Sequence, residues 1–214
     1  MLFTTEFMSD LIHAVDKTIK ENAAEVTTLD QILGDGDHIT NLQRGINALK
    51  ALDAEIAQLS WSEAYLKTGM TLLTTMGGAS GSLFGTFFIT MGKETKNAAI
   101  INQDLFTEAY IQAVAAVKKR GKSDAGEKTM LDVLIPVADL LEENRLAPAT
   151  LPDLLDNISL TAISGMQSTR DMLATKGRAS YLQEKSIGHI DAGAKTTQLI
   201  ICTITAELKQ HLAD

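Results

Sequence analysis

The sequence predicts an all-α protein, and three observations lead to that prediction. Only three prolines interrupt the 214 residues. Apolar residues recur at helical spacing in most segments, and these segments are rich in Ala, Leu, Glu and Lys, which favour helices. The sequence has no alternating strand pattern, apart from the short run AAII at 98–101, which we leave unassigned. We therefore expect a single domain over residues 1–214, an antiparallel bundle or closed barrel of about eight amphipathic helices.

Apolar spacing and capping residues set the predicted helix bounds. Thr40 with Gln43 forms the pattern of a capping box, and Ser60 begins the next helix in the same way. Thr150 and Asp191 are the expected N-caps of the last two helices. The predicted helices span about residues 4–24, 40–58, 60–75, 80–93, 102–118, 129–144, 150–176 and 191 onward.

Two of these helices have further distinctive features. The helix at 80–93 is apolar on all sides, which predicts a central and buried position. The helix at 150–176 ends at Lys176 and Gly177, a cation followed by a glycine, as helix C-termini often do. A long loop over residues 178–190 then precedes Asp191.

Composition excludes several classes of protein. The net charge of −8 argues against a nucleic-acid partner, which would need a basic face. Cys202 is the single cysteine, so no internal disulfide can form, and a reducing, cytoplasmic location is expected. The first residues carry acids and lack a basic region, unlike a secretory signal. No apolar run reaches the roughly 20 residues that would span a bilayer, so we expect no membrane partner.

Three aspartates, Asp30, Asp35 and Asp37, lie within eight residues and are separated by glycines. At about 5 Å, each pair of carboxylates repels by roughly 3 kcal/mol unless a cation lies between them. Hard oxygen ligands of this kind suit Mg²⁺ or Ca²⁺. The spacing does not fit an EF-hand, which needs Gly at its sixth and Glu at its twelfth position. The alternative is a solvated acidic turn that caps a helix, and spacing alone favours neither.

A glycine run at 77–81 precedes a helix, so its free N–H groups could bind an anion. A tight turn between closely packed helices would need the same small residues, and for the run alone we favour that alternative. The tetrapeptide at 120–123, RGKS, resembles the end of a P-loop, but no strand precedes it and we reject that assignment. Gly121 still permits a close approach of the backbone to a ligand.

Four further polar residues lie in the candidate loops. Arg178 could bind phosphate through its forked donors, and Asp191 lies at the other end of the same loop. Taken alone, each is better explained as surface charge or a helix cap. His38 and His189 could act as general bases, but isolated histidines are more often structural.

The polar and glycine-rich connections fall at 29–39, 77–81, 119–128 and 178–190. They are the first, third, fifth and seventh connections between the predicted helices. In an up-and-down arrangement alternate connections share one end of the molecule, so we expect all four to form one site.

Four motifs, GDGDHITN, MGGASGSLFGTFF, GEKTMLDVL and GRASYLQEKSIGHIDAGA, resemble the L subunit of dihydroxyacetone kinase over nearly the whole chain. The resemblance implies a barrel of eight antiparallel helices, with ADP or ATP and two Mg²⁺ ions at one end. It implies Asp30, Asp35 and Asp37 as metal ligands. It implies nucleotide contacts at His38, Ile39, Thr40, Asn41, Ala79, Ser80, Gly121, Met130, Arg178, Asp191, Ala192 and Gly193.

Two residues depart from the family pattern. Ile39 stands where the family usually has glycine, and a positive φ there would strain an isoleucine. Ala192 stands where proline is usual, which loosens the first turn of a helix.

The resemblance also implies a mechanism and partners. A multiphosphoryl protein carrying phosphohistidine would recharge bound ADP, and the phosphoryl group would pass to dihydroxyacetone on a separate K subunit. No catalytic side chain is then required of this subunit, because phosphoryl transfer needs mainly positioning and charge neutralisation. The alternatives are an ATP-dependent kinase subunit for another short ketose or polyol, a nucleotide-loaded co-regulator that binds a transcriptional regulator, and a degenerate, inactive homologue.

Overall fold

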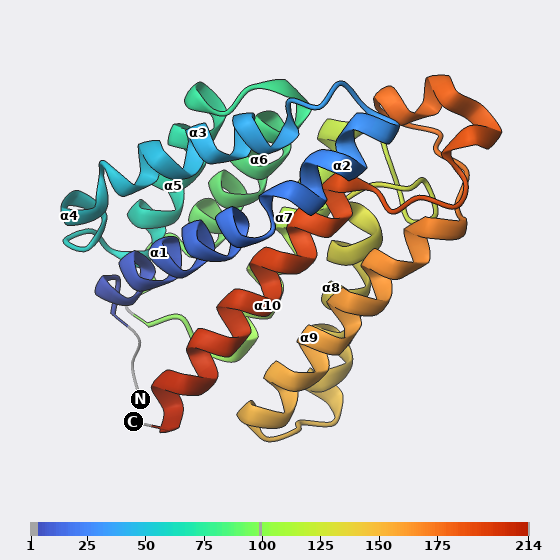
Figure 1. Ribbon diagram of the computed structural model, residues 1–214. Helices are drawn as coiled ribbons and strands as arrows, with labels where there is room; N and C mark the ends of the chain where they lie inside the picture. Colours follow the sequence, from blue (N-terminus) through green and yellow to red (C-terminus); the bar gives the residue numbers. More distant parts are fainter. Residues whose placement is uncertain (1–3, 99, 214) are drawn as a thin grey trace. The chain divides into compact units, whose positions relative to one another are not determined.

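The computed structural model describes residues 4–98 and 100–213, and every regular element in those ranges is helical. Ten α-helices and two 3-10 segments follow one another in this part of the chain (Figure 1). The all-α prediction is therefore confirmed. The chain divides into two compact units, the described parts of Met1–Asp16 with Asn41–Gly121, and of Lys17–Thr40 with Lys122–Asp214. Closure into a barrel and a single domain remain predictions.

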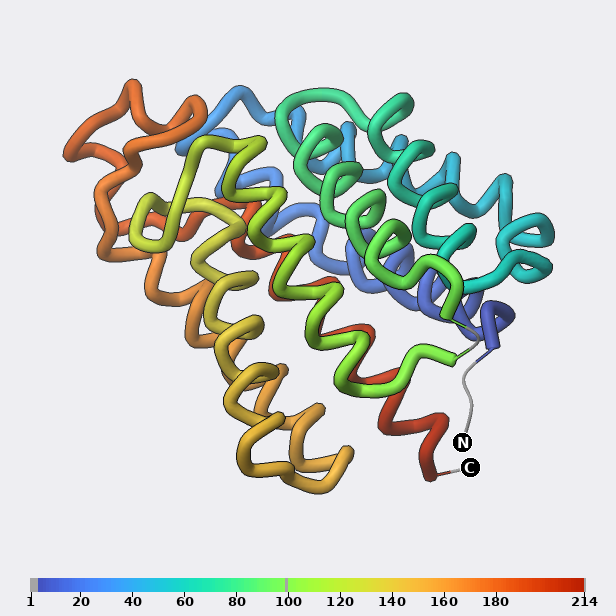
Figure 2. Tube along the Cα trace, turned by 180° about the vertical axis from the view of Figure 1, so that it is seen from behind, coloured from blue at the N-terminus to red at the C-terminus, as the bar shows by residue number. Residues whose placement is uncertain are grey.

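The first unit is built around three consecutive helices that pack side by side, drawn from teal to light green in Figure 2. These are α5 (Trp61–Thr75), α6 (Gly78–Glu94) and α7 (Gln103–Gly121). The unit also holds α4 (Asp53–Ile56), the first part of α1 (Glu6–Glu21) and most of α3 (His38–Lys50), because its limits fall inside those two helices.

Helices α5 and α6 approach closely at two glycines. A Cβ added to Gly69 would lie 2.6 Å from the backbone nitrogen of Ile89 and 2.7 Å from the carbonyl oxygen of Gly85. Phe84 and Met91 of α6 are buried, whereas Phe87 and Phe88 are only half-buried. The prediction of a wholly buried helix therefore holds for only part of α6, which packs its small residues against α5.

The second unit contains α2 (Ala23–Leu33), α8 (Leu131–Leu146), α9 (Leu151–Ser168) and α10 (Ala192–Ala213), together with two 3-10 segments. Helix α9 packs between α8 and α10, and α10 also contacts α2. Segment η1 (Thr169–Asp171) extends α9, and η2 (Arg178–Ser186) lies against the end of α2 (Figure 1). A small apolar cluster of Leu33, Ala174, Ala179 and Leu182 holds η2 there.

Several predicted helix starts are confirmed by their hydrogen bonds. Ser60 and Glu63 form a complete capping box. The Asn102 side chain accepts from the Leu105 amide at 2.9 Å, and that of Thr150 accepts from the Asp153 amide. The Asp191 carboxylate accepts from the Ala194 amide at 2.8 Å.

The predicted acidic loop is partly helical. The chain breaks at Asn22 and then forms α2, so Asp30 lies on a helix instead of in a loop. The capping box at Thr40 was also wrong, because α3 begins at His38. The Gln43 side chain instead donates to Asp16 at 2.6 Å.

Three other predicted bounds require correction. Helix α3 ends at Lys50, and the short helix α4 covers part of what we expected to be its continuation. Helix α9 ends at Ser168, well before Lys176, and η2 occupies most of the predicted loop at 178–190. Helix α7 extends to Gly121, so the polar connection begins at residue 122, three residues later than predicted. Within the described residues, no helix combines the length and the hydropathy needed to cross a membrane.

Candidate functional site

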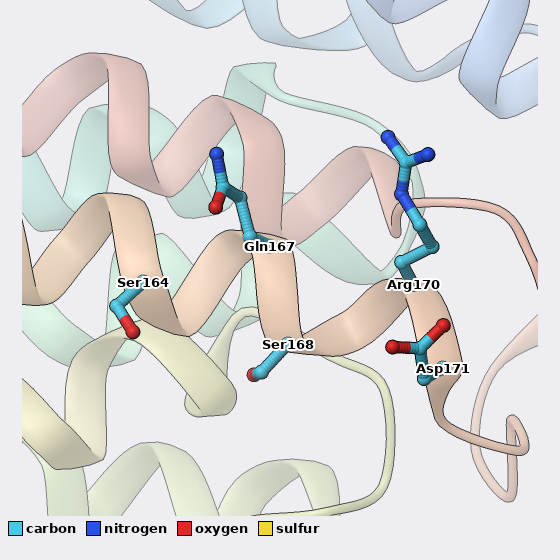
Figure 3. Close-up of a pocket in the computed structure, with 5 residues that line it drawn as sticks. All are labelled: Ser164, Gln167, Ser168, Arg170 and Asp171. Carbon is cyan, nitrogen blue, oxygen red and sulfur yellow. The ribbon is translucent and has the colours of Figure 1, made fainter.

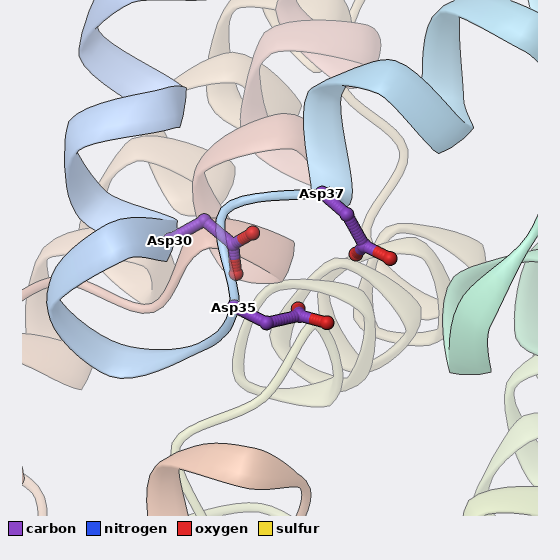
Figure 4. Close-up of side chains that lie close together, drawn as sticks. All are labelled: Asp30, Asp35 and Asp37. Atoms are coloured by element: carbon purple, nitrogen blue, oxygen red, sulfur yellow. The ribbon is translucent and has the colours of Figure 1, made fainter.

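The three aspartates of the acidic cluster lie together in the second unit (Figure 4). Asp30 comes from the last turn of α2, while Asp35 and Asp37 come from the connection that leads to α3. Each offers a carboxylate oxygen, and these oxygens all lie within 4.8 Å of one another. The three carboxylates are therefore close enough to repel one another, as expected from the sequence. This donor set, three hard carboxylate oxygens, fits a divalent cation such as Mg²⁺.

Two glycines allow the carboxylates to converge. A Cβ on Gly34 would lie 2.3 Å from Oδ1 of Asp30, so a side chain at residue 34 would push that carboxylate away. Gly36 has a φ of 76°, in the left-handed region that glycine adopts without strain. The other Asp30 oxygen accepts from the His38 amide at 3.0 Å and so anchors the start of α3.

Arg178 contacts the acidic cluster directly. Its Nη2 lies 2.8 Å from Oδ2 of Asp35, and the guanidinium is largely exposed. The pair joins η2 to the 34–37 connection, and it brings a donor suited to phosphate next to carboxylates suited to a metal.

His38 lies beside the same cluster with its side chain largely enclosed. Its Nε2 lies 3.0 Å from the hydroxyl of Thr196 on α10. Burial lowers the pKa of His38, and the nearby Asp30 and Asp37 partly oppose that effect. A neutral imidazole is therefore favoured, and it links the start of α3 to Thr196, in the second turn of α10.

The connection at 122–130 is folded around Asp132. The two carboxylate oxygens of Asp132 accept from the amides of Gly126, at 2.5 Å, and Thr129, at 2.7 Å. Asp132 is buried, and so is Met130, one of the expected nucleotide contacts. Glu127 of the same connection accepts from the hydroxyl of Thr175 at 3.1 Å. Three of the four polar connections thus meet in the second unit, through the Asp35–Arg178 pair and through Lys128, which donates to the carbonyl of His189.

The start of α10 is placed by Asp191. Besides capping Ala194, Asp191 donates its own amide to the hydroxyl of Thr169 at 3.1 Å. Burial raises the pKa of the Asp191 carboxyl to about 6, against the lowering effect of its hydrogen bonds and of Lys128. A Cβ on Gly193 would lie 3.9 Å from the backbone nitrogen of Met130, so these two expected contacts are neighbours.

The remaining expected contacts belong to the first unit. Ala79 and Ser80 lie in the first turn of α6, whose N-cap is Gly77. The side-chain oxygen of Asn41 would lie 2.4 Å from a Cβ on Gly77, so Asn41 and the glycine run are in contact. Gly121 is the last residue of α7. That all four polar connections share one site remains a prediction. That prediction rested on the order of the connections along the chain. This order also changes, because α2 and α4 each add a connection that the sequence did not predict.

The two departures from the family pattern are mild in this fold. Ile39 is the second residue of α3 and is not among the residues with positive φ. It is therefore not strained in the way a left-handed isoleucine would be. Ala192 is the buried first residue of α10, where Asp191 supplies the cap.

Two important residues were missed from the sequence, Lys128 and Asp132. Thr129 and Asp132 have the spacing of a helix N-terminus, a pattern we had used elsewhere to find caps. A buried lysine has no comparable sequence signal, because Lys128 follows an acidic, exposed stretch.

An open polar pocket of about 510 Å³ lies outside the predicted residues (Figure 3). Ser164, Gln167 and Ser168 of α9 line it together with Arg170 and Asp171 of η1.

Residues 32–206 match the DAK2 domain. The chain belongs to the DAK2-domain family. It is 41% identical, over 85% of its length and 86% of the relative's, to the PEP-dependent dihydroxyacetone kinase 1, ADP-binding subunit DhaL, of Listeria innocua. It is 38% identical to the corresponding Escherichia coli subunit, over 86% of this chain and 88% of that one. The resemblance to the L subunit, proposed from four motifs, is thereby confirmed.

Solved structures support the same fold. The native dihydroxyacetone kinase of C. freundii superposes with a TM-score of 0.73 at 23% identity, over 94% of this chain. The same kinase in complex with AMP-PNP and Mg²⁺ gives a TM-score of 0.72 at 22% identity, over 96% of this chain. This chain spans 34% of that longer kinase, about a third of its length.

Proposed function

We propose that this chain is the ADP/ATP-binding subunit of a dihydroxyacetone kinase that takes its phosphoryl group from a phosphohistidine protein. The observation that carries the proposal is the 41% identity to a PEP-dependent ADP-binding subunit, which extends over most of both chains. The convergence of three carboxylates within 4.8 Å, at the segment that resembles that family, also supports it.

The acidic cluster is the proposed metal site, with Asp30, Asp35 and Asp37 as ligands for Mg²⁺. The fit rests on donor chemistry, because three carboxylate oxygens from one short segment suit a hard cation and no sulfur or imidazole is among them. When bound, Mg²⁺ would neutralise charge on nucleotide phosphates. The family resemblance implies two such ions.

The nucleotide would be held by backbone groups and one guanidinium. Arg178 carries a forked donor beside the acidic cluster. The first turns of α6, with Ala79 and Ser80, and of α10, with Ala192 and Gly193, offer amides that attract anions. The other proposed contacts are His38, Ile39, Thr40, Asn41, Gly121, Met130 and Asp191.

The subunit itself would position the nucleotide phosphates and exclude water from them. It would supply no nucleophile. Bound ADP would receive its phosphoryl group from the phosphohistidine partner and pass it to dihydroxyacetone held on a K subunit, giving dihydroxyacetone phosphate. Such transfer depends on alignment and on charge stabilisation. We further propose a cytoplasmic location, which the single cysteine favours.

Two alternative functions use the same site. An ATP-dependent subunit for another short ketose or polyol would need no phosphohistidine donor. A nucleotide-loaded co-regulator would bind a transcriptional regulator without turnover. The degenerate homologue loses its main argument, because Ile39 is helical and has no positive φ.

The test begins with protein purified without added nucleotide, in which we expect co-purified ADP. A K subunit and dihydroxyacetone are then supplied with either phosphoenolpyruvate and the general phosphotransfer proteins, or ATP alone. Product from the first mixture only supports the proposal. Product from ATP alone favours the ATP-dependent alternative, and nucleotide binding without product in either mixture favours the co-regulator. Protein that neither retains nor binds ADP would contradict the proposed function.

A further inference from the structure

Lys128 is the largest fully buried side chain among the described residues, with 1% of its surface exposed. Its backbone also has a φ of 62°, a left-handed conformation that residues other than glycine, Asn and Asp seldom adopt. Desolvation of an ammonium and a left-handed backbone both cost free energy. Specific contacts must offset both costs.

Those contacts are two backbone carbonyls from other segments. The Lys128 Nζ donates to the carbonyl oxygens of Thr169 and His189. Thr169 begins η1 at the end of α9, and His189 lies just before α10. One ammonium therefore ties the 122–130 connection to the segments that end α9 and precede α10.

The same network continues into the start of α10. The Thr169 hydroxyl donates to the Met166 carbonyl at 2.7 Å and accepts from the Asp191 amide at 3.1 Å. Burial lowers the pKa of Lys128, while Asp191, Asp171 and Asp132 oppose that effect. The three carboxylates thus help to keep the ammonium charged within its buried position.

Lys128 contributes to the geometry of two expected nucleotide contacts without being one itself. Met130 follows it by two residues, and Gly193 follows Asp191 by two. A Cβ on Gly193 would lie 4.0 Å from the Cβ of Met130, so a shift between the two segments would change the space between these residues.

We propose that Lys128 is a positioning residue for nucleotide binding, which holds Met130 beside the first turn of α10 through the carbonyls of Thr169 and His189. The inference rests on the proposed function, because it concerns the same nucleotide site. Lys128 then contributes to the affinity for the nucleotide as well as to the stability of the fold.

Two variants test it, with binding of ADP measured by calorimetry at saturating Mg²⁺. Lys128→Met keeps the length of the side chain without the charge. Lys128→Gly removes the side chain at a φ that glycine tolerates, which favours folding. We expect both to bind ADP at least about ten-fold more weakly than the wild-type protein, as disrupted supporting contacts typically cause. Added butylammonium should restore binding to Lys128→Gly, while 1-butanol should not.

Leu155→Ala is the matched control, because Leu155 is buried in α9 and makes none of these contacts. It should lower the melting temperature yet leave the Kd for ADP unchanged. If Lys128→Met binds ADP as the wild-type protein does, or if butylammonium restores melting temperature but not binding, the inference is wrong. Wild-type protein that fails to bind ADP would instead overturn the proposed function, and this inference with it.

Discussion

Arg178 lies 2.8 Å from Asp35, so a cation donated by η2 already contacts one of the three converging carboxylates. The two residues come from segments more than 140 positions apart in sequence, and the ion pair joins those segments. Because the guanidinium is 67% exposed, the pair itself stabilises the fold by no more than about 1 kcal/mol. Its consequence concerns binding, since Arg178 and a metal ion would compete for the same carboxylate.

The first prediction follows from that competition. Arg178→Gln should bind Mn²⁺, used as a probe for Mg²⁺, up to about five-fold more tightly without nucleotide, since removing a nearby positive charge gains up to about 1 kcal/mol. The same variant should bind ADP more weakly, because the forked phosphate donor is lost. Electron paramagnetic resonance measures free Mn²⁺, and calorimetry measures ADP. Arg145→Gln, which removes a guanidinium paired with Glu142 on α8, should change neither.

The second prediction concerns the repulsion within the cluster. Asp37→Asn should weaken Mn²⁺ binding by at least about ten-fold, because a charged ligand becomes a neutral one. Without metal it should unfold at the same temperature or up to about 4 °C higher, since one less carboxylate repels Asp30 and Asp35. Asp10→Asn, an exposed acid on α1, should leave metal binding unchanged. A lower melting temperature without metal would show that Asp37 stabilises the fold and would refute the repulsion argument.

The Asp cluster also shows how far sequence reasoning reached. The composition and spacing of Asp30, Asp35 and Asp37 were enough to predict a shared site, because residues within eight positions can hardly separate. The helical position of Asp30 was not predicted, since residues 23–33 lack a clear polar face and Asn22 is only a weak break. Helix α2 gains its stability from packing against α10, and no local pattern can show such a contact.

Local contacts could be predicted from the sequence, whereas long-range contacts could not. Capping by Ser60 and Asp191 is local, and its residue pattern was sufficient. The buried Lys128 could not be found, because its partners are carbonyls at positions 169 and 189, and a carbonyl has no signature in the sequence. The α9 end was misplaced because Lys176 and Gly177 resemble a helix C-terminus, whereas the chain already leaves the helix after Ser168.

The third prediction uses Gly34 to separate metal binding from stability. In Gly34→Ala the new Cβ would meet Oδ1 of Asp30 at 2.3 Å, so the flexible carboxylate must turn away. We expect Mn²⁺ binding weaker by roughly 10–100-fold, as for other disturbed ligand positions, and a loss of stability of about 1 kcal/mol. Binding is measured by electron paramagnetic resonance and stability by urea unfolding.

Thr28→Ala on the same helix is the control for Gly34→Ala, because Thr28 is exposed and points its hydroxyl only to the Ala24 carbonyl. It should leave Mn²⁺ binding unchanged. Tight metal binding by Gly34→Ala would mean that Asp30 is not a ligand, and the metal site would then need to be reassigned.

The fourth prediction concerns pH and Asp191. Burial raises the pKa of its carboxyl from 3.8 to about 6, so the folded protein binds a proton that the unfolded chain releases between these values. Stability from this group is therefore fully present below about pH 4 and is lost as the pH rises toward 6. A difference of about two pH units corresponds to a loss of about 3 kcal/mol.

Asp191→Asn tests this sign, because asparagine keeps an oxygen that can cap α10 but cannot ionise. Urea unfolding of both proteins between pH 4 and pH 7 gives the free energy difference at each pH. Wild-type stability should fall relative to the variant across that range, whatever constant offset arises from the lost attraction to Lys128. A difference that stays flat with pH would show that the Asp191 carboxyl titrates at its ordinary value, and that its burial carries no cost in the folded protein.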